Sequence, residues 1–70
     1  MKEFSLSGHE FIQLDSLLKV MGLCPSGGMA KSMIAQGHVR VDGNVELRKR
    51  CKIRKGQVIE YEGNKTVVKP

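Results

Sequence analysis

The amino-acid sequence predicts an α+β fold, in which two short helices pack on one face of a small, mainly antiparallel β-sheet. Apolar residues recur at helical spacing between residues 14 and 34 and alternate at strand spacing beyond residue 38. Glycine-containing turns separate these segments. The 70-residue chain shows no linker and no internal repeat, so we expect one domain over residues 1–70.

Four apolar residues at positions i, i+3, i+4 and i+7 predict a first helix: Leu14, Leu17, Leu18 and Met21. Gly22 stands where a left-handed residue commonly ends a helix, and Pro25 blocks its continuation. Ser26 is a good N-cap for a second helix, which Gly37 ends. Its apolar positions keep helical spacing: Ala30, Met33 and Ile34. The two helices are predicted to form a helix–turn–helix pair.

Strand patterns occupy both ends of the chain. Phe4 and Leu6 alternate with polar residues, which suits a short edge strand followed by a turn at residues 7–9. After the second helix, residues 39–41 alternate, and Asp42-Gly43 is a favoured hairpin turn because both central residues need positive φ.

The chain is expected to return along residues 44–46 and then to leave the sheet at residues 47–50, which are too charged to be buried. Lys52-Ile53 is predicted to rejoin the same sheet. Two last strands, at residues 58–62 and 65–68, are predicted to be joined by a Gly63-Asn64 turn. The charged segment that leaves the sheet should lie at one end of it, near the beginning of the second helix.

The positive charge of the chain is concentrated in residues 40–55. This stretch holds seven basic and two acidic residues, a net +5, whereas the rest holds five of each sign. Such a localised field attracts a polyanion, most commonly nucleic acid. A solvated loop is the plainer interpretation, but the arginines suit bidentate phosphate contacts. The basic residues of the stretch are Arg40, Arg48, Lys49, Arg50, Lys52, Arg54 and Lys55.

The second helix opens with Ser26-Gly27-Gly28, and Lys31 follows one turn later. Glycine in a helix costs roughly 1 kcal/mol relative to alanine. One interpretation is a plain N-cap with two flexible glycines. The other is close approach of a phosphate to the exposed amides at the helix start. The residues leave both interpretations open.

Several other chemistries fit the residues poorly. The glycines around Gly22 and Gly27 miss the spacing of a nucleotide-binding P-loop, and Cys24, Cys51, His9 and His38 lack the close pairing of zinc ligands. No Cys–His or Ser–His pair stands out for catalysis. Only three aromatic residues are present, which argues against a stacking platform for single strands. We therefore expect no enzyme activity, metal or cofactor.

No apolar run approaches the roughly 20 residues of a membrane span, and no signal-peptide pattern occurs. We therefore expect a cytoplasmic protein whose two cysteines are free thiols. A chain this short also leaves little room for a deep substrate pocket, so no small-molecule substrate is expected.

The ordered set of motifs resembles the alpha-L RNA-binding domain, named after the small-subunit ribosomal protein S-four. The motifs are the Ser-initiated second helix, Gly37-x-Val39-x-Val41-Asp42-Gly43 and a later Gly56 before a strand. Within that family, the chain resembles the small stand-alone bacterial members more closely. Two segments carry this likeness: Ser26-Gly27-Gly28-x-Ala30-Lys31 and Asp42-Gly43-x-x-Glu46-x-Arg48-Lys49-x-x-Lys52. The resemblance covers roughly residues 14–61.

The resemblance implies non-catalytic binding of structured RNA through the second helix and the loop that holds the basic run. It implicates Ser26, Lys31, Arg40, Arg48, Lys49, Arg50 and Lys52, while Arg54 and Lys55 are added from charge alone. Many family members carry arginine after the helix-opening serine. Here Gly27 stands there, so either its backbone contacts the phosphate or that contact is lost.

We therefore expect a monomer that binds structured RNA, with ribosomal RNA, transfer RNA and the ribosome as candidate partners. One alternative is a protein-interaction module whose basic patch meets an acidic partner. Another is the RNA-binding appendage of an enzyme, although neither end of the chain carries a linker and both look complete.

Overall fold

The computed structural model describes residues 1–70 and confirms the α+β class. Five strands form a main sheet in the order β1-β7-β6-β3-β4, and β2 and β5 form a separate two-stranded pair. Only β1 and β7 run parallel, so the sheet is mainly antiparallel as predicted. The elements are β1 (Lys2–Ser5), β2 (Ile12–Gln13), α1 (Leu14–Val20), α2 (Gly27–Ala35), β3 (Val39–Val41), β4 (Asn44–Val45), β5 (Lys52–Ile53), β6 (Val58–Tyr61) and β7 (Asn64–Lys69).

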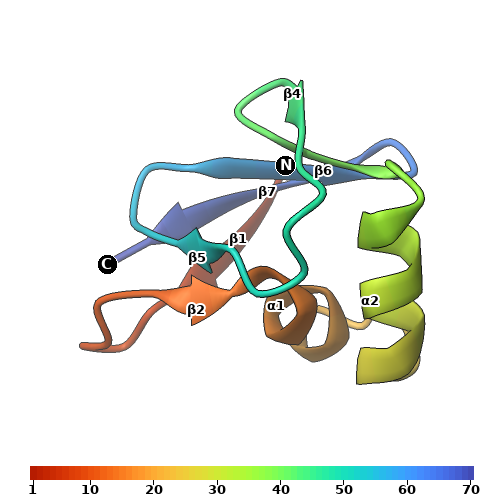
Figure 1. The fold of residues 1–70 in the computed structure, drawn as a ribbon. Coiled ribbons are helices and arrows are strands. Elements are labelled where there is room, and N and C mark those ends of the chain that lie inside the picture. The colour runs from red at the N-terminus through yellow and green to blue at the C-terminus, as the bar shows by residue number, and fades with distance from the viewer.

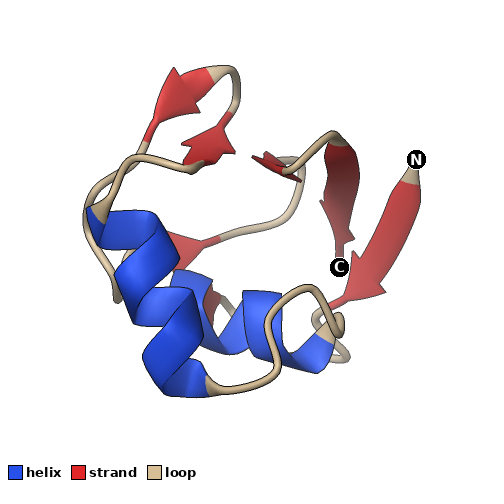
Figure 2. Cartoon of the chain, turned by 90° about the vertical axis from the view of Figure 1, so that its right-hand side faces the viewer, coloured by secondary structure: helices blue, strands red, loops and turns tan.

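The hydrophobic core lies between one face of the main sheet and a layer made by the two helices and the β2–β5 pair. In Figure 1, β6 and β7 run across the upper part of the molecule, with α1 and the β2–β5 pair beneath them. Figure 2 shows both helices on the same side of the main sheet. Thirteen apolar residues form the core: Leu6, Leu14, Leu17, Leu18, Cys24, Ala30, Ile34, Val39, Val41, Ile53, Ile59, Tyr61 and Val68.

The predicted helix ends are confirmed. Gly22 adopts φ +74° just after α1, and Gly37 adopts φ +84° just after α2. The Ser26 Oγ accepts a hydrogen bond of 3.1 Å from the Met29 amide, which is the expected N-cap of α2. The first helix has no such side-chain cap, and its first amides find other partners.

The hairpin at Asp42-Gly43 is also confirmed, with φ of +51° and +85° at its two central residues. Asp42 further ties this turn to β6. Its backbone amide donates to the Val58 carbonyl at 2.8 Å, and its carboxylate accepts from the Val58 amide at 3.0 Å. The edge of the sheet that leads into the basic residues is therefore firmly held.

Two sequence predictions about the strands were wrong. Lys52-Ile53 does not rejoin the main sheet but forms β5 and pairs with β2, Gln13 lying opposite Lys52. No place is open beside β6, since β3 and β7 already flank it. The last hairpin turns at Glu62-Gly63, with φ of +49° and +79°, one residue before the predicted position. Glycine prefers the second central position of such a turn.

Candidate nucleic-acid interface

Residues 46–51, here called the basic loop, connect β4 to β5 and are anchored to the beginning of α1. The Leu14 amide donates to the Cys51 carbonyl at 2.9 Å, and the Asp15 amide donates to the Lys49 carbonyl at 3.1 Å. The first amides of a helix have no partner within it, so the loop carbonyls act as the cap that α1 lacks. Figure 1 shows the loop descending from β4 to α1. The sequence prediction placed the loop near the beginning of α2, whereas its backbone is anchored to the beginning of α1 and its Leu47 side chain lies beside Gly37, past the end of α2.

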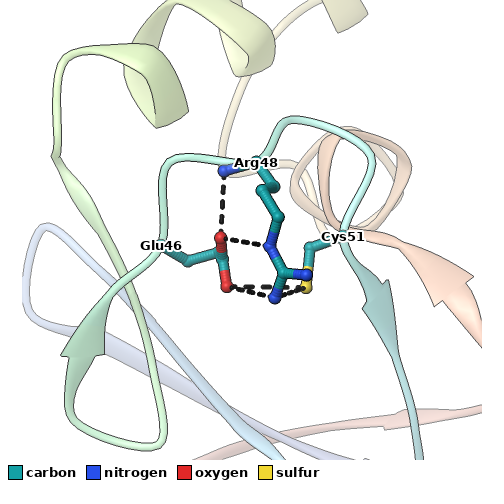
Figure 3. Close-up of polar contacts among 3 residues, drawn as sticks. All are labelled: Glu46, Arg48 and Cys51. Atoms are coloured by element: carbon teal, nitrogen blue, oxygen red, sulfur yellow. Dashed lines mark hydrogen bonds and ion pairs between the residues drawn. The ribbon is translucent and has the colours of Figure 1, made fainter.

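An internal ion pair holds the shape of the basic loop (Figure 3). Glu46 Oε2 accepts from the Arg48 Nε at 2.9 Å and from the Arg48 backbone amide at 3.0 Å, while Arg48 Nη2 donates to Oε1 at 3.0 Å. These contacts lower the pKa of Glu46 to about 2 and raise that of Arg48 above its ordinary value. The Cys51 thiol lies 3.6 Å from Oε1. Burial, followed by the Glu46 charge, raises the pKa of this thiol.

Arg48 is therefore only partly available to a ligand. Its side chain is 77% exposed, whereas that of Glu46 is only 17% exposed. The Nε and Nη2 groups are occupied by the carboxylate, and Nη1 makes no hydrogen bond within the chain. A bidentate pair fixes a planar guanidinium in place. Arg48 thus orders the loop and can offer one remaining edge to a phosphate.

Lys49 and Arg50 lie at the tip of the basic loop, exposed and without an acidic partner. Arg48–Glu46 is the one ion pair within 4.0 Å in the structure, so the charges of these two residues are not neutralised by a direct contact. Because the loop backbone is hydrogen-bonded at both α1 contacts, the tip is held while its side chains remain solvated.

The next two cations of the run lie in β5 and just after it. Lys52 and Arg54 are exposed, whereas Ile53 between them is fully buried. This alternation is that of a strand with one face on the core. The Lys52 Nζ lies 5.0 Å from the centre of the Phe11 ring, and the Arg54 Cζ lies 5.6 Å from it. Both distances suit cation–π contacts, so Phe11 orders two basic side chains on one surface.

The beginning of α2 provides a second, separate group of predicted residues. Ser26 is exposed and Gly27 and Lys31 are half-buried. A Cβ at Gly27 would meet no atom within 4 Å, and one at Gly28 would meet only the Ser26 Oγ at 3.9 Å. Packing therefore does not explain the two glycines.

Arg40 is not brought together with the other basic residues. It lies in β3 between the buried Val39 and Val41, so its side chain occupies the solvent face of the main sheet. There it stands opposite Glu60 of β6 in the strand register. Its one internal contact joins Nη1 to the Gly43 carbonyl at 3.5 Å. The helices and the β2–β5 pair lie on the other face.

No group of three or more His, Cys, Asp or Glu side chains is arranged to hold a metal ion. Cys24 and Cys51 are free thiols. None of the helices has both the length and the apolar character that a membrane span requires.

Comparison with known proteins gives the family. The model of the S4 domain matches residues 4–69. The chain belongs to the S4 domain family. The S4 domain is an RNA-binding module that is typically non-catalytic, and the resemblance to the alpha-L domain is thereby confirmed.

Two curated S4 domain relatives are the YbcJ proteins of Escherichia coli (strain K12) and Shigella flexneri. Each is 48% identical over 68 residues, covering 97% of this chain and 97% of the relative. The solution structure of Escherichia coli YbcJ, described as revealing an alpha-L motif involved in RNA-binding, has a TM-score of 0.77 and 47% identity. That match covers 100% of this chain and 89% of the other.

Sequence reasoning missed two residues of this S4 domain surface, Phe11 and Glu46. Glu46 had a readable signal, since it lies two residues before Arg48 in a segment without regular structure. Phe11 had none, because it lies 41 positions before Lys52 and 43 before Arg54. Only the β2–β5 pairing brings these residues together.

Replacing Gly27 and Gly28 by alanine tests whether the beginning of α2 contacts phosphate. Both sites have room for a Cβ and negative φ, so the free energy of unfolding is expected to rise by about 0.5–2 kcal/mol in total. If the helix amides contact RNA closely, affinity should fall despite this gain. Urea unfolding and RNA titration measure the two effects. Ser32→Ala, in the middle of the same helix, is the control, and unchanged affinity in the glycine variant would rule out close approach.

Proposed function

We propose that this chain binds structured RNA, without catalysis, through the basic loop and the β5 residues that follow it. The observation that carries the proposal is a group of exposed cations within residues 49–55 that have no acidic partner: Lys49, Arg50, Lys52, Arg54 and Lys55. Membership in the S4 domain family and the RNA-binding description of the YbcJ structure support it.

The arrangement suits a phosphate backbone better than base edges. Phosphate contacts position a protein on nucleic acid but carry no sequence information. The loop and β5 offer charged tips on a surface that is held by backbone hydrogen bonds, with no exposed aromatic cluster for reading single bases. Folded RNA would be recognised by its shape and its 2′-hydroxyl groups. Sequence specificity is therefore modest.

The remaining predicted residues have graded roles in this proposal. Arg48 orders the loop through Glu46 and offers one edge of its guanidinium to phosphate. Ser26, Gly27 and Lys31 form a second contact region at the beginning of α2. Arg40, on the outer face of the sheet, contributes long-range attraction rather than a direct contact.

The proposal extends to the setting in which the chain works. In this proposal the chain acts in the cytoplasm as a monomer, with one domain over residues 1–70. Ribosomal RNA, on or off the ribosome, and transfer RNA are the candidate ligands, because both present folded backbones with closely spaced phosphates.

The test is binding of an RNA hairpin, a DNA duplex of matched sequence and a single-stranded RNA over a range of salt concentrations. We expect a preference for the hairpin and a log–log slope of about −3 to −5, corresponding to some five phosphate contacts. Equal binding to all three would leave only a generic polyanion patch. No binding at low salt would overturn the proposal in favour of an acidic protein partner.

A further inference from the structure

A cleft opens at the end of the molecule beyond β5, where the N-terminal turn faces the turn before β6. Its volume is about 360 Å³. The segments that line it are the turn after β1, the turn after β5 and the C-terminus. All three lie at the left of Figure 1. The residues that line it are Leu6, Gly8, His9, Glu10, Arg54, Lys55 and Pro70.

Both walls of the cleft are held by hydrogen bonds. On one side, the Arg54 amide donates to the Gln57 side chain at 2.7 Å, and the Gly56 amide donates to the Val68 carbonyl at 2.8 Å. On the other, the His9 amide donates to the Leu6 carbonyl at 3.1 Å, and the Leu6 amide donates to the Lys69 carbonyl at 2.9 Å. The cleft is thus formed before any ligand arrives, which reduces the entropic cost of binding.

The chemistry of the lining suits a small anionic group. Two of the seven lining residues are basic, Arg54 and Lys55, and they lie in the cleft with the apolar side chains of Leu6 and Pro70. Arg54 and Lys55 line the cleft, are exposed, and have no carboxylate within 4.0 Å of their charged groups. Glu10 also lines the cleft, and its charge opposes an anion. The Phe11 contact further restricts the guanidinium of Arg54.

The cleft continues the surface that starts at the basic loop. Lys55 follows Arg50 by five residues, so their Cα atoms are at most about 18 Å apart. Lys52 of β5 and Arg54, the residue that follows β5, lie between them in the chain, and both are exposed. A strand of nucleic acid that leaves the basic loop along β5 would therefore reach the cleft within a few nucleotides.

We propose that this cleft binds a phosphate group of a single-stranded extension that continues from the folded RNA held by the basic loop. This inference rests on the proposed function. It adds a second subsite, in which Lys55 and Arg54 supply the charge and Glu10 limits the affinity. It also sets a preference among structured RNAs for those with an unpaired end or flanking strand.

The experiment compares one RNA hairpin with and without single-stranded extensions of increasing length, using the full chain. The extension is expected to raise affinity. Lys55→Ala should reduce that gain by about threefold or more, and Glu10→Gln should increase it, because each changes the charge at the cleft by one unit. Glu10→Gln should leave binding of the plain hairpin nearly unchanged. Lys55→Ala also removes a cation of the proposed hairpin-binding surface, so for each variant the gain is measured as the ratio of its affinities for the extended and the plain hairpin. Lys65→Ala removes the same charge at the opposite end of β7 and should leave the gain unchanged.

The outcomes separate this inference from the proposed function. A plain hairpin that fails to bind contradicts the proposed function and the cleft inference with it. A hairpin that binds with loop dependence, but gains nothing from any extension, overturns the cleft inference alone. A second experiment titrates the chain with inorganic phosphate and follows the NMR amide signals of Gly8 and Lys55, to test whether the cleft binds free phosphate. Phosphate that shifts these signals while extensions add nothing would assign the cleft to a free phosphate-bearing ligand and overturn the RNA extension.

Discussion

Replacement of Lys49, Arg50 and Lys52 by alanine is expected to weaken binding of an RNA hairpin by about tenfold or more at moderate salt. The three side chains are exposed, and no acidic group pairs with them. The log–log salt slope should become shallower by about 2 to 3, because each lost phosphate contact removes roughly 0.7–0.9 from it. Fluorescence anisotropy over a salt series measures both quantities.

Arg48 is left unchanged in this variant because it has a structural role. Its pair with Glu46 sets the shape of the loop, so its loss would mix two effects. The matched control removes three lysines from other surfaces: Lys2, Lys19 and Lys65. An equal loss of affinity in the control would reduce the basic loop to part of a general positive field. Loss of folding in the loop variant would show that the cluster is structural, against its exposure.

The helices and the first hairpin could be predicted because their signals are local. A helix needs apolar residues three and four apart with caps at its ends, and all of these lie within about ten residues. Ser26, Gly22 and Gly37 do what their sequence positions indicate. The Asp42-Gly43 turn is equally local, because two adjacent residues determine its geometry. The family resemblance was based on the order of these local motifs along the chain, and it is confirmed.

The β2–β5 pair could not be predicted because its information is not local. Each strand has only two residues, too few to show alternation, and Ile12 and Ile53 are 41 positions apart. The pairing depends on the basic loop, whose carbonyls bind the first amides of α1 and thereby bring β5 beside β2. Such contacts involve backbone groups, which every residue shares. The missed turn at Glu62-Gly63 differs from its prediction by one residue, the usual error of an element boundary.

The candidate surface was visible in the sequence as charge but not as geometry. The run from Arg48 to Lys55 is contiguous, so its net charge could be read directly. Which of its members are free could not, because Glu46 folds back onto Arg48 and Phe11 approaches from another strand. Charge counts add residues along the chain, whereas a binding surface depends on side-chain directions. Arg40 illustrates the difference, since strand alternation turns it to the outer face.

Truncation of Ile53 is expected to have the largest effect on stability. Its side chain is fully buried, whereas its chain neighbours Lys52 and Arg54 are exposed cations, so it ties the basic surface to the core. Ile53→Ala should lower the free energy of unfolding by about 2–5 kcal/mol, and Ile53→Val by about 0.5–1.5 kcal/mol. A 70-residue domain has only a few kcal/mol of net stability. Urea unfolding should therefore find the alanine variant largely unfolded at 25 °C.

Ile53→Val then separates folding from binding. It keeps every charge, so the folded variant should bind the hairpin as well as the parent chain does. Val20→Ala truncates an apolar side chain that is 63% exposed, and it should change stability by no more than about 0.5 kcal/mol. An unchanged unfolding midpoint for Ile53→Ala would mean that the β2–β5 pair does not pack on the core. In that case the basic residues of β5 would lack the rigid support on which a preformed phosphate-binding surface depends.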